Sequence, residues 1–203
     1  MTHPHWWREA CAHLSKDPDL ARLIEGCKGE RLASRGDAFA TLLRSIIGQQ
    51  ISVRAAASVM QRLETRLGET NPQQLLAQNE EQLRGCGLSR SKVRYCRAVA
   101  EFCLDPPDWH ATDPGELKKQ LIAVPGIGEW TWEMFAIFYL QLPDEFPLRD
   151  LGLCKALTLA CGLAHPDEIH TPTMQARIQS WRPWRTAATW HLWRSLDPLP
   201  VAY

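Results

Sequence analysis

The sequence predicts an all-α protein. Apolar residues recur at helical spacing along nearly the whole chain, and no segment alternates apolar and polar residues as a half-buried strand would. Capping residues and glycines divide these apolar segments into helices of ordinary length. With 203 residues, of which 45% are hydrophobic, the chain can bury one good core or two small lobes that share a cleft.

The apolar periodicity places the helices at 5–15, 17–26, 37–48, 52–67, 72–78, 80–85, 90–104, 114–123, 129–141, 151–161, 172–181 and 184–196. Several starts are marked by an N-cap residue or a first-turn proline, at Asp37, Asn71-Pro72, Asp113-Pro114 and Pro183. Helix ends are marked by Gly68, Gly87 and Gly162. The chain has no repeat and no low-complexity linker that would indicate a further domain.

A Pro-Gly-Ile-Gly turn at 125–128 lies between two of these helices and predicts a helix-hairpin-helix. Gly126 and Gly128 can adopt positive φ and lack a Cβ, so the turn can be tight and another backbone can approach it. The helix that follows exposes unpaired N–H groups and the positive end of its dipole, which suit a DNA phosphate. An ordinary interhelical turn is the alternative, because Pro-Gly and Ile-Gly are common in turns.

Asp150 begins another apolar helix, in the context Phe-Pro-Leu-Arg-Asp-Leu-Gly at 146–152. This segment and the hairpin together resemble the helix-hairpin-helix DNA glycosylases, and within them the AlkA-type 3-methyladenine DNA glycosylase II branch. Further segments fit the same family, so the resemblance runs from about residue 37 to the C-terminus: 42–52, 87–93 and 181–193. The larger bacterial relative has an additional segment before its catalytic lobes, so this chain resembles a compact form.

The resemblance implies two helical lobes with a substrate cleft between them. One lobe comprises 36–139 and carries the hairpin at about 117–140, and the other comprises 1–35 with 140–203 and carries the catalytic aspartate. The implied function is a monofunctional DNA glycosylase of base excision repair. It would flip alkylated purines, 3-methyladenine and 7-methylguanine, out of duplex DNA. It would then hydrolyse their N-glycosidic bond and leave an abasic site.

Asp150 is the predicted catalytic residue. Breaking an N-glycosidic bond moves positive charge onto the deoxyribose, and a fixed carboxylate beside C1′ stabilises that charge. At ~4 Å and an effective dielectric constant of ~20 the attraction is about 4 kcal/mol, or roughly a thousandfold in rate. The same carboxylate can orient or deprotonate the attacking water. A plain N-cap role, worth ~1 kcal/mol, is the alternative, and the two roles can coexist.

The base pocket is predicted from the tryptophans, of which the chain has nine. Trp130 and Trp193 match positions that line the pocket in the family, whereas we expect the other tryptophans to be core residues. Met134 replaces an aromatic residue at the pocket floor. A cationic alkylated purine over a Trp face gains about 0.5 to 2 kcal/mol. Relatives that also cut the strand carry a lysine at the position of Trp130, so we expect no lyase activity.

Duplex DNA with alkylated bases is the predicted partner. The resemblance assigns the DNA contacts to Gln49, Gln50, Ser52, Ser89, Lys92, Pro125, Gly126, Ile127, Gly128 and Thr131. Gln50 takes the place of a leucine that fills the gap left by the flipped base. The net charge is zero, so phosphate attraction must come from the basic stretches 84–97 and 177–194, which contain no acidic residue. Solvated helix faces are the alternative interpretation of these stretches.

The sequence also bears on bound ions, the state of the cysteines and the cellular location. The resemblance implies a structural Na⁺ or K⁺ on the backbone carbonyls of Ile122, Val124 and Ile127, but no cofactor for catalysis. The seven cysteines are odd in number and scattered, which predicts reduced thiols. Cys154 and Cys161 match the start of an iron–sulfur pattern, but no cysteine follows them, so we expect no cluster. With neither a signal peptide nor a membrane span, we expect a cytoplasmic, nucleoid-associated monomer.

Two other functions fit the same features. A non-catalytic helix-hairpin-helix module would bind DNA without needing Asp150. A helical protein-interaction domain would use the aromatic residues for a partner and would not bind DNA.

Overall fold

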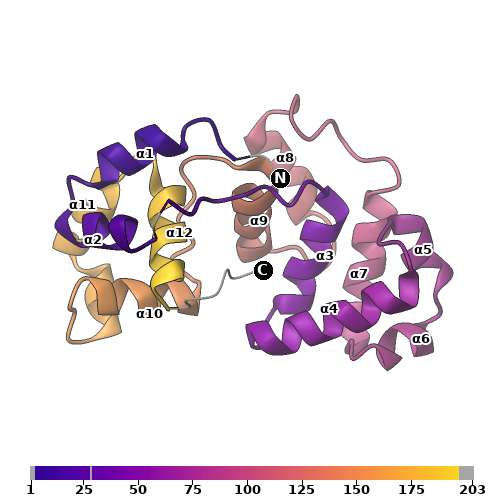
Figure 1. Cartoon of the computed structure of the whole chain (residues 1–203). Helices are drawn as coiled ribbons and strands as arrows, with labels where there is room; N and C mark the ends of the chain where they lie inside the picture. Colours follow the sequence, from indigo (N-terminus) through magenta and orange to yellow (C-terminus); the bar gives the residue numbers. More distant parts are fainter. Residues whose placement is uncertain (1–2, 28, 197–203) are drawn as a thin grey trace. The chain divides into compact units, whose positions relative to one another are not determined.

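The computed structural model describes residues 3–27 and 29–196, and this part of the chain is helical with no strand, which confirms the all-α prediction. The chain divides into two compact units (Figure 1). Among the described residues, unit 1 combines those up to Ser34 with those from Ala136 to Leu196, and unit 2 runs from Arg35 to Phe135. None of the described helices is both long and apolar enough to cross a membrane.

Unit 2 is built around helix α3 (Ala38–Gly48), which contacts α4, α7 and α9. The side chains of Leu42, Leu43 and Ile46 are completely buried there. The helices that surround α3 or continue the unit are α4 (Val53–Leu67), α5 (Pro72–Ala77), α6 (Glu80–Gly85), α7 (Arg90–Phe102), α8 (Pro114–Ile122) and α9 (Glu129–Phe135). Burial of apolar side chains on α3 therefore stabilises this unit.

Unit 1 is built around α12 (Arg185–Leu196), which contacts α1, α2 and α10. Ala187, Ala188 and Leu192 of α12 are completely buried. The remaining elements are α1 (Trp7–Leu14), α2 (Pro18–Gly26), the π-helical segment η1 (Ala136–Leu140), α10 (Leu151–Ala160), the 3-10 helix η2 (Pro166–His170) and α11 (Pro172–Ser180). The N-terminal helices thus pack on C-terminal ones (Figure 1).

The predicted capping residues form the helix ends. The carboxylates of Asp37 and Asp113 and the amide oxygen of Asn71 each accept a backbone N–H from the first turn of their helices. Gly68, Gly87 and Gly162 follow helices with φ of 72°, 100° and 63°, the left-handed region in which glycine is least strained. The sequence did not predict η2, because a five-residue 3-10 turn is too short to show a period.

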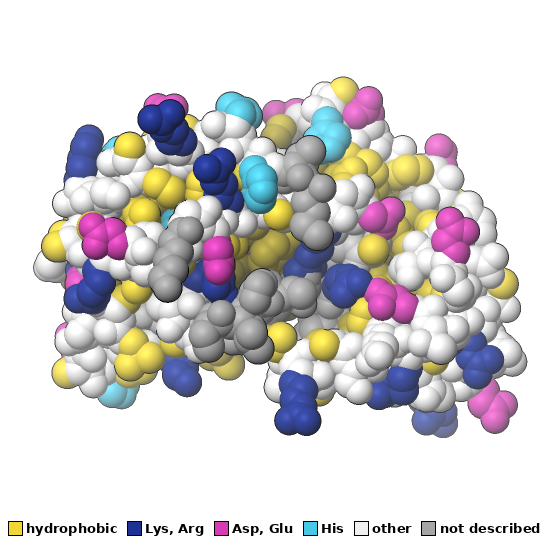
Figure 2. Space-filling view, viewed as in Figure 1, with side chains coloured by type: hydrophobic (Ala, Val, Ile, Leu, Met, Phe, Trp, Pro, Cys, Tyr) yellow, Lys and Arg dark blue, Asp and Glu magenta, His cyan; other side chains and the backbone are white. Residues whose placement is uncertain are grey.

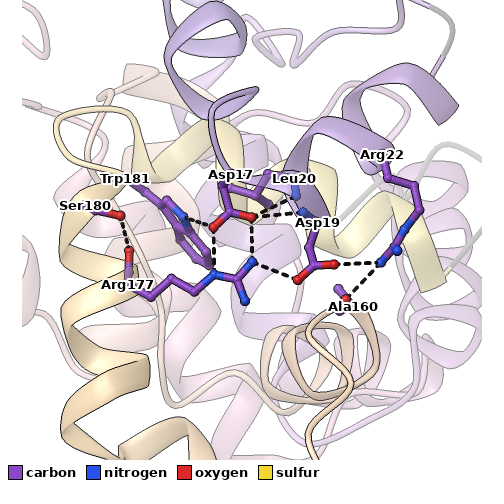
Figure 3. Close-up of polar contacts among 8 residues, drawn as sticks. All are labelled: Asp17, Asp19, Leu20, Arg22, Ala160, Arg177, Ser180 and Trp181. Atoms are coloured by element: carbon purple, nitrogen blue, oxygen red, sulfur yellow. Dashed lines mark hydrogen bonds and ion pairs between the residues drawn. The ribbon is translucent and has the colours of Figure 1, made fainter.

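A partly buried ion pair joins the N-terminal segment of unit 1 to α11 (Figure 3). Nε and Nη2 of Arg177 donate to the two carboxylate oxygens of Asp17 at 2.7 and 2.6 Å, and Nη2 also donates to Asp19 at 2.8 Å. Trp181 Nε1 donates to Asp17 Oδ2 at 3.0 Å. Burial opposes the charge on Asp17, but the hydrogen bonds from Arg177 and Trp181 outweigh it and lower the pKa of that carboxyl.

The seven cysteines are all free in the structure. Cys96 and Cys103 lie in unit 2, where burial raises the pKa of each thiol to about 12. Such thiols are protonated at neutral pH and behave as small apolar core residues.

Candidate DNA-binding and catalytic sites

The hairpin turn of unit 2 uses its two glycines differently. Gly126 has φ of 94°, and a Cβ at this position would collide with the ring of Tyr95. Gly128 is not in the left-handed region, and a Cβ there would meet no atom within 4 Å. The expectation of positive φ is therefore confirmed for Gly126 and wrong for Gly128. Because Gly128 has no side chain, the space beside the first residues of α9 is open.

The turn connects α8 to α9 through the six non-helical residues 123–128. The N–H of Ile127 donates to the carbonyl of Val124 at 3.0 Å, and that of Trp132 donates to the carbonyl of Gly128 at 3.0 Å. The first N–H groups of α9 come before this intrahelical bond and have no partner from the preceding turn of a helix. Together with the helix dipole, they provide a small electropositive backbone surface beside Gly128.

Two of the predicted DNA-contact residues, Gln49 and Lys92, form hydrogen bonds within unit 2. Nε2 of Gln49 donates to the carbonyl of Gly126 and to Oγ1 of Thr131, both at 2.9 Å. Nζ of Lys92 donates to the carbonyls of Ile47 and Gln49 at 2.6 and 2.8 Å. Desolvation lowers the pKa of Lys92. Sequence spacing does not reveal that these donors are already used within the protein, and a DNA contact by either residue stays a prediction.

The other predicted contacts divide into exposed and buried residues. Gln50 is exposed and has φ of 59°, an uncommon backbone for a non-glycine residue and one that concentrates at functional loops. Ser52 and Ser89 are exposed N-caps of α4 and α7. Ile127 and Thr131 are buried, at 5% and 1% exposure. Their side chains therefore face the core, and only their backbone groups could meet DNA, whereas Pro125 is exposed.

The carbonyls of Ile122, Val124 and Ile127 fit a monovalent cation by their chemistry, because neutral carbonyl oxygens are ligands for hard cations. The Val124 carbonyl accepts one hydrogen bond, from Ile127, and a carbonyl oxygen has a second lone pair. Within the described residues, no group of three or more His, Cys, Asp or Glu side chains is arranged to hold a metal ion.

Asp150 of unit 1 is the N-cap of α10, as predicted. Its Oδ1 accepts the backbone N–H of Leu153 at 2.7 Å and the indole N–H of Trp193 at 3.0 Å. A Cβ on Gly152 would lie 3.1 Å from the same oxygen and 3.7 Å from Nε1 of Trp193. The glycine that follows Asp150-Leu151 thus leaves room for this carboxylate to be held by two donors.

Trp193 differs from the predicted pocket wall. It is 4% exposed, and its ring stacks on Phe138 with centroids 5.8 Å apart and planes at 12°. In the structure Trp193 binds Asp150 from α12, and that its face receives a base stays a prediction. The hydrogen bond links residues 43 positions apart, and no local signal in the sequence indicates it.

The other two predicted pocket residues lie in unit 2, on α9. Trp130 is half-buried, and its ring approaches Gly48 at the end of α3, 3.9 Å from where a Cβ would be. Met134 is 1% exposed and packs in the core. Helix α9 thus turns Met134 inward, and its role as a pocket floor stays a prediction.

The basic stretch 177–194 proves to be used within unit 1. Each of its four arginines pairs with an acid: Arg177 with Asp17 and Asp19, Arg182 and Arg185 with Asp144, and Arg194 with Glu30. The acids come from distant parts of the sequence, so sequence spacing does not show these ion pairs, and a DNA-binding patch there stays a prediction. Lys and Arg side chains are scattered among acidic and uncharged ones on the viewed face (Figure 2).

In the other basic stretch, 84–97, the side chains of Arg84, Arg90 and Arg94 are exposed.

Comparison with protein families provides the deciding observation. Residues 43–185 match the HhH-GPD superfamily base excision DNA repair protein family. The chain belongs to this superfamily. The match covers the hairpin of unit 2 and both Asp150 and the start of α12 in unit 1.

Relatives of this HhH-GPD chain include 3-methyladenine glycosylases. It is 31% identical to DNA-3-methyladenine glycosylase 2 of Escherichia coli, over 86% of this chain and 63% of that protein. It is 30% identical to a probable bifunctional transcriptional activator/DNA repair enzyme AlkA of Mycobacterium tuberculosis, over 91% of this chain but only 38% of that protein. The chain thus spans well under half of the mycobacterial relative.

The HhH-GPD chain also resembles solved structures. It matches the Schizosaccharomyces pombe 3-methyladenine DNA glycosylase Mag1, determined in complex with abasic DNA, with a TM-score of 0.80 and 26% identity. The match covers 96% of this chain and 99% of that one. An 8-oxoguanine glycosylase/lyase of Clostridium acetobutylicum, at 15% identity and a TM-score of 0.74, shares the fold alone.

Proposed function

We propose that this chain is a monofunctional DNA glycosylase that hydrolyses alkylated purines, 3-methyladenine and 7-methylguanine, from duplex DNA and leaves an abasic site. The observation that carries the proposal is the carboxylate of Asp150, which is fixed by the Leu153 amide and the Trp193 indole in a chain of a base excision repair family. The similarity to 3-methyladenine glycosylases supports the choice of alkylated purines.

In this proposal Asp150 stabilises the transition state. As the N-glycosidic bond lengthens, the deoxyribose becomes positively charged, and a carboxylate already held in place need not reorganise to meet that charge. At ~4 Å and an effective dielectric constant of ~20 the attraction is about 4 kcal/mol. The two N–H donors to Oδ1 fix the orientation of the group on α10. Asp150 would then orient or deprotonate the water that completes hydrolysis.

Duplex binding is assigned to the hairpin. The backbone N–H groups at the start of α9 would donate to a phosphate, and Gly128 leaves the space for the phosphate to approach. A cation on the neighbouring carbonyls would add positive charge at the same place. Because Lys92 and the arginines of 177–194 bind within the protein, few side chains remain for further phosphate contacts.

Recognition of the base would depend on charge and on leaving-group ability. A 3-methyl- or 7-methylpurine is cationic, so it gains more than a neutral base from stacking on an aromatic face. Half-buried Trp130 is the proposed aromatic residue. Such a base leaves without protonation by the enzyme, so the site needs no general acid for the leaving group.

Water is the proposed nucleophile. Trp130 stands two residues after Gly128, where relatives that cut the strand have a lysine, and residues 126–142 contain no lysine. An amine that could form a Schiff base is therefore missing from the matching place.

A panel of duplexes tests the proposal. Each duplex carries one damaged base and is treated with alkali after incubation, and a parallel sample receives borohydride. We expect excision of 7-methylguanine, strand breaks only after alkali, and no covalent protein–DNA adduct. A trapped adduct would contradict the monofunctional assignment, and no excision of any alkylated purine would contradict the substrate class.

A further inference from the structure

We propose that Lys92 and Gln49 form an internal strut that positions the hairpin turn, and that neither side chain binds a DNA phosphate. The inference rests on the proposed DNA-binding function of the hairpin. It makes both side chains positioning residues, which act on DNA only through the backbone of the turn.

The first half of the strut joins α7 to the end of α3. Nζ of Lys92 donates to the carbonyls of Ile47 and Gln49 at 2.6 and 2.8 Å. The last carbonyls of a helix have no intrahelical partner and carry the negative end of its dipole, so an ammonium group satisfies them and is attracted to them. The half-buried Lys92 therefore fixes the backbone from which the Gln49 side chain extends.

The second half of the strut joins Gln49 to both sides of the hairpin turn. Its Nε2 donates to the carbonyl of Gly126 and to Oγ1 of Thr131, at 2.9 Å each. Gly126 is in the turn and Thr131 is in the first turn of α9. A side-chain amide has two N–H donors, and both are occupied here. Gln49 thus sets the angle between the turn and the helix whose N–H groups face the proposed phosphate.

Helix α7 also contacts the hairpin turn through a second residue, Tyr95. Tyr95, three residues after Lys92, places its ring so close to Gly126 that a Cβ there would collide with it. The two residues lie on neighbouring positions of one helix face. The turn is therefore held by a hydrogen-bonded amide and by an aromatic ring, both positioned through α7 and the end of α3.

A phosphate would have to displace these bonds to reach either side chain. Two of the three N–H donors of the Lys92 ammonium are used by carbonyls, and both donors of the Gln49 amide are used. A strut that is already formed lowers the ordering cost of binding, because the turn does not have to be fixed when DNA arrives. Its loss should weaken DNA affinity without removing an ionic contact.

Salt dependence separates positioning from direct contact. Binding of a duplex with an abasic site is measured over a range of KCl concentrations for the wild type, Lys92→Met and Gln49→Met. We expect both variants to bind roughly tenfold more weakly, with an unchanged slope of log K against log salt. A slope for Lys92→Met that is smaller by about 0.9 would mean that Lys92 neutralises a phosphate, and would overturn the proposal.

Amide hydrogen exchange without DNA provides a second and independent test. Residues 121–131 should exchange faster in Lys92→Met and Gln49→Met than in the wild type. Arg90→Met is the matched control, because Arg90 is on the same helix with its side chain 81% exposed, and it should leave exchange of the hairpin unchanged. Unchanged exchange in both strut variants would overturn the proposal.

The two tests also distinguish this inference from the proposed function. If the wild type does not bind duplex DNA, the proposed function fails, and hydrogen exchange alone decides whether the strut exists. If the wild type binds DNA but exchange and affinity of Lys92→Met and Gln49→Met equal those of the wild type, the strut fails and the function stands. Gln49→Met is nearly isosteric and uncharged, so it remains informative should Lys92→Met fold poorly.

Discussion

The indole N–H of Trp193 donates to the same carboxylate oxygen of Asp150 that caps α10, at a distance of 3.0 Å. The bond crosses from α12 to α10 within unit 1. Asp150 is therefore held by a helix N-terminus and by a side chain from another helix. Such double restraint is what a carboxylate needs if it must meet a developing charge without reorganising.

Trp193→Phe should lower excision of 7-methylguanine by roughly tenfold to a hundredfold, because a hydrogen bond to a charged group is worth about 1.5 to 3 kcal/mol. Phenylalanine keeps an aromatic ring against Phe138 but removes the N–H donor. Single-turnover rates measure the effect. Trp190→Phe, on the same helix, is the control and should retain the wild-type rate. Equal rates for Trp193→Phe and wild type would show that the bond does not matter for chemistry.

Gly152→Ala should slow excision severalfold while leaving the melting temperature unchanged or higher. The added Cβ would lie 3.1 Å from Asp150 Oδ1 and would push the carboxylate out of place, whereas alanine is the better helix former by about 1 kcal/mol. Gly115→Ala is a close control, since its Cβ would also lie 3.1 Å from the N-cap oxygen, that of Asp113 on α8. Slower excision in both variants would point to a general loss of stability instead.

Gly128→Asp should abolish duplex binding and preserve the fold. A Cβ at this position meets no atom within 4 Å and the backbone is not left-handed, so the side chain fits, but its charge repels a phosphate at the start of α9. Gly128→Ala controls for size and should bind within a few-fold of the wild type. Fluorescence anisotropy measures both. Strong binding by Gly128→Asp would place the DNA contact elsewhere.

Asp17→Asn should destabilise unit 1 by about 1 to 2 kcal/mol at neutral pH, because it removes the charge of the bidentate partner of Arg177, which keeps its bond to Asp19. Asparagine still caps α2, so the loss reports the ion pair. The folded-state pKa of Asp17 lies below its ordinary value of 3.8, so its contribution is complete above that value and is lost as the pH falls through the lowered pKa. Urea unfolding should show the two proteins converging in acid. A constant difference down to the acid limit would contradict this.

The helices could be predicted from sequence because their signals are local. Asp37, Asn71 and Asp113 cap helices with their own side chains, and Gly126 takes the backbone that only glycine adopts without strain. Asp150 was found through its sequence context. In each of these cases the residues that decide the structure are neighbours in the chain.

The partners of charged and polar side chains could not be predicted, because they come from distant positions. Arg177 meets Asp17 across 160 residues, and Gln49 meets Thr131 across 82. In the sequence, Arg177 is part of a basic stretch and Gln49 and Thr131 are part of family motifs, and both patterns suggest DNA contacts. Only the fold shows that their donors are occupied, and that Trp193 holds the carboxylate of Asp150.

The most direct test of the account is the rate of 7-methylguanine excision by Asp150→Asn. Asparagine can cap α10 and accept the N–H of Trp193, so the fold and most of the DNA affinity should remain. The charge that stabilises the transition state is lost, and the rate should fall by about a thousandfold. A rate close to that of the wild type, in a variant that binds DNA normally, would contradict the assignment of Asp150 as the catalytic residue.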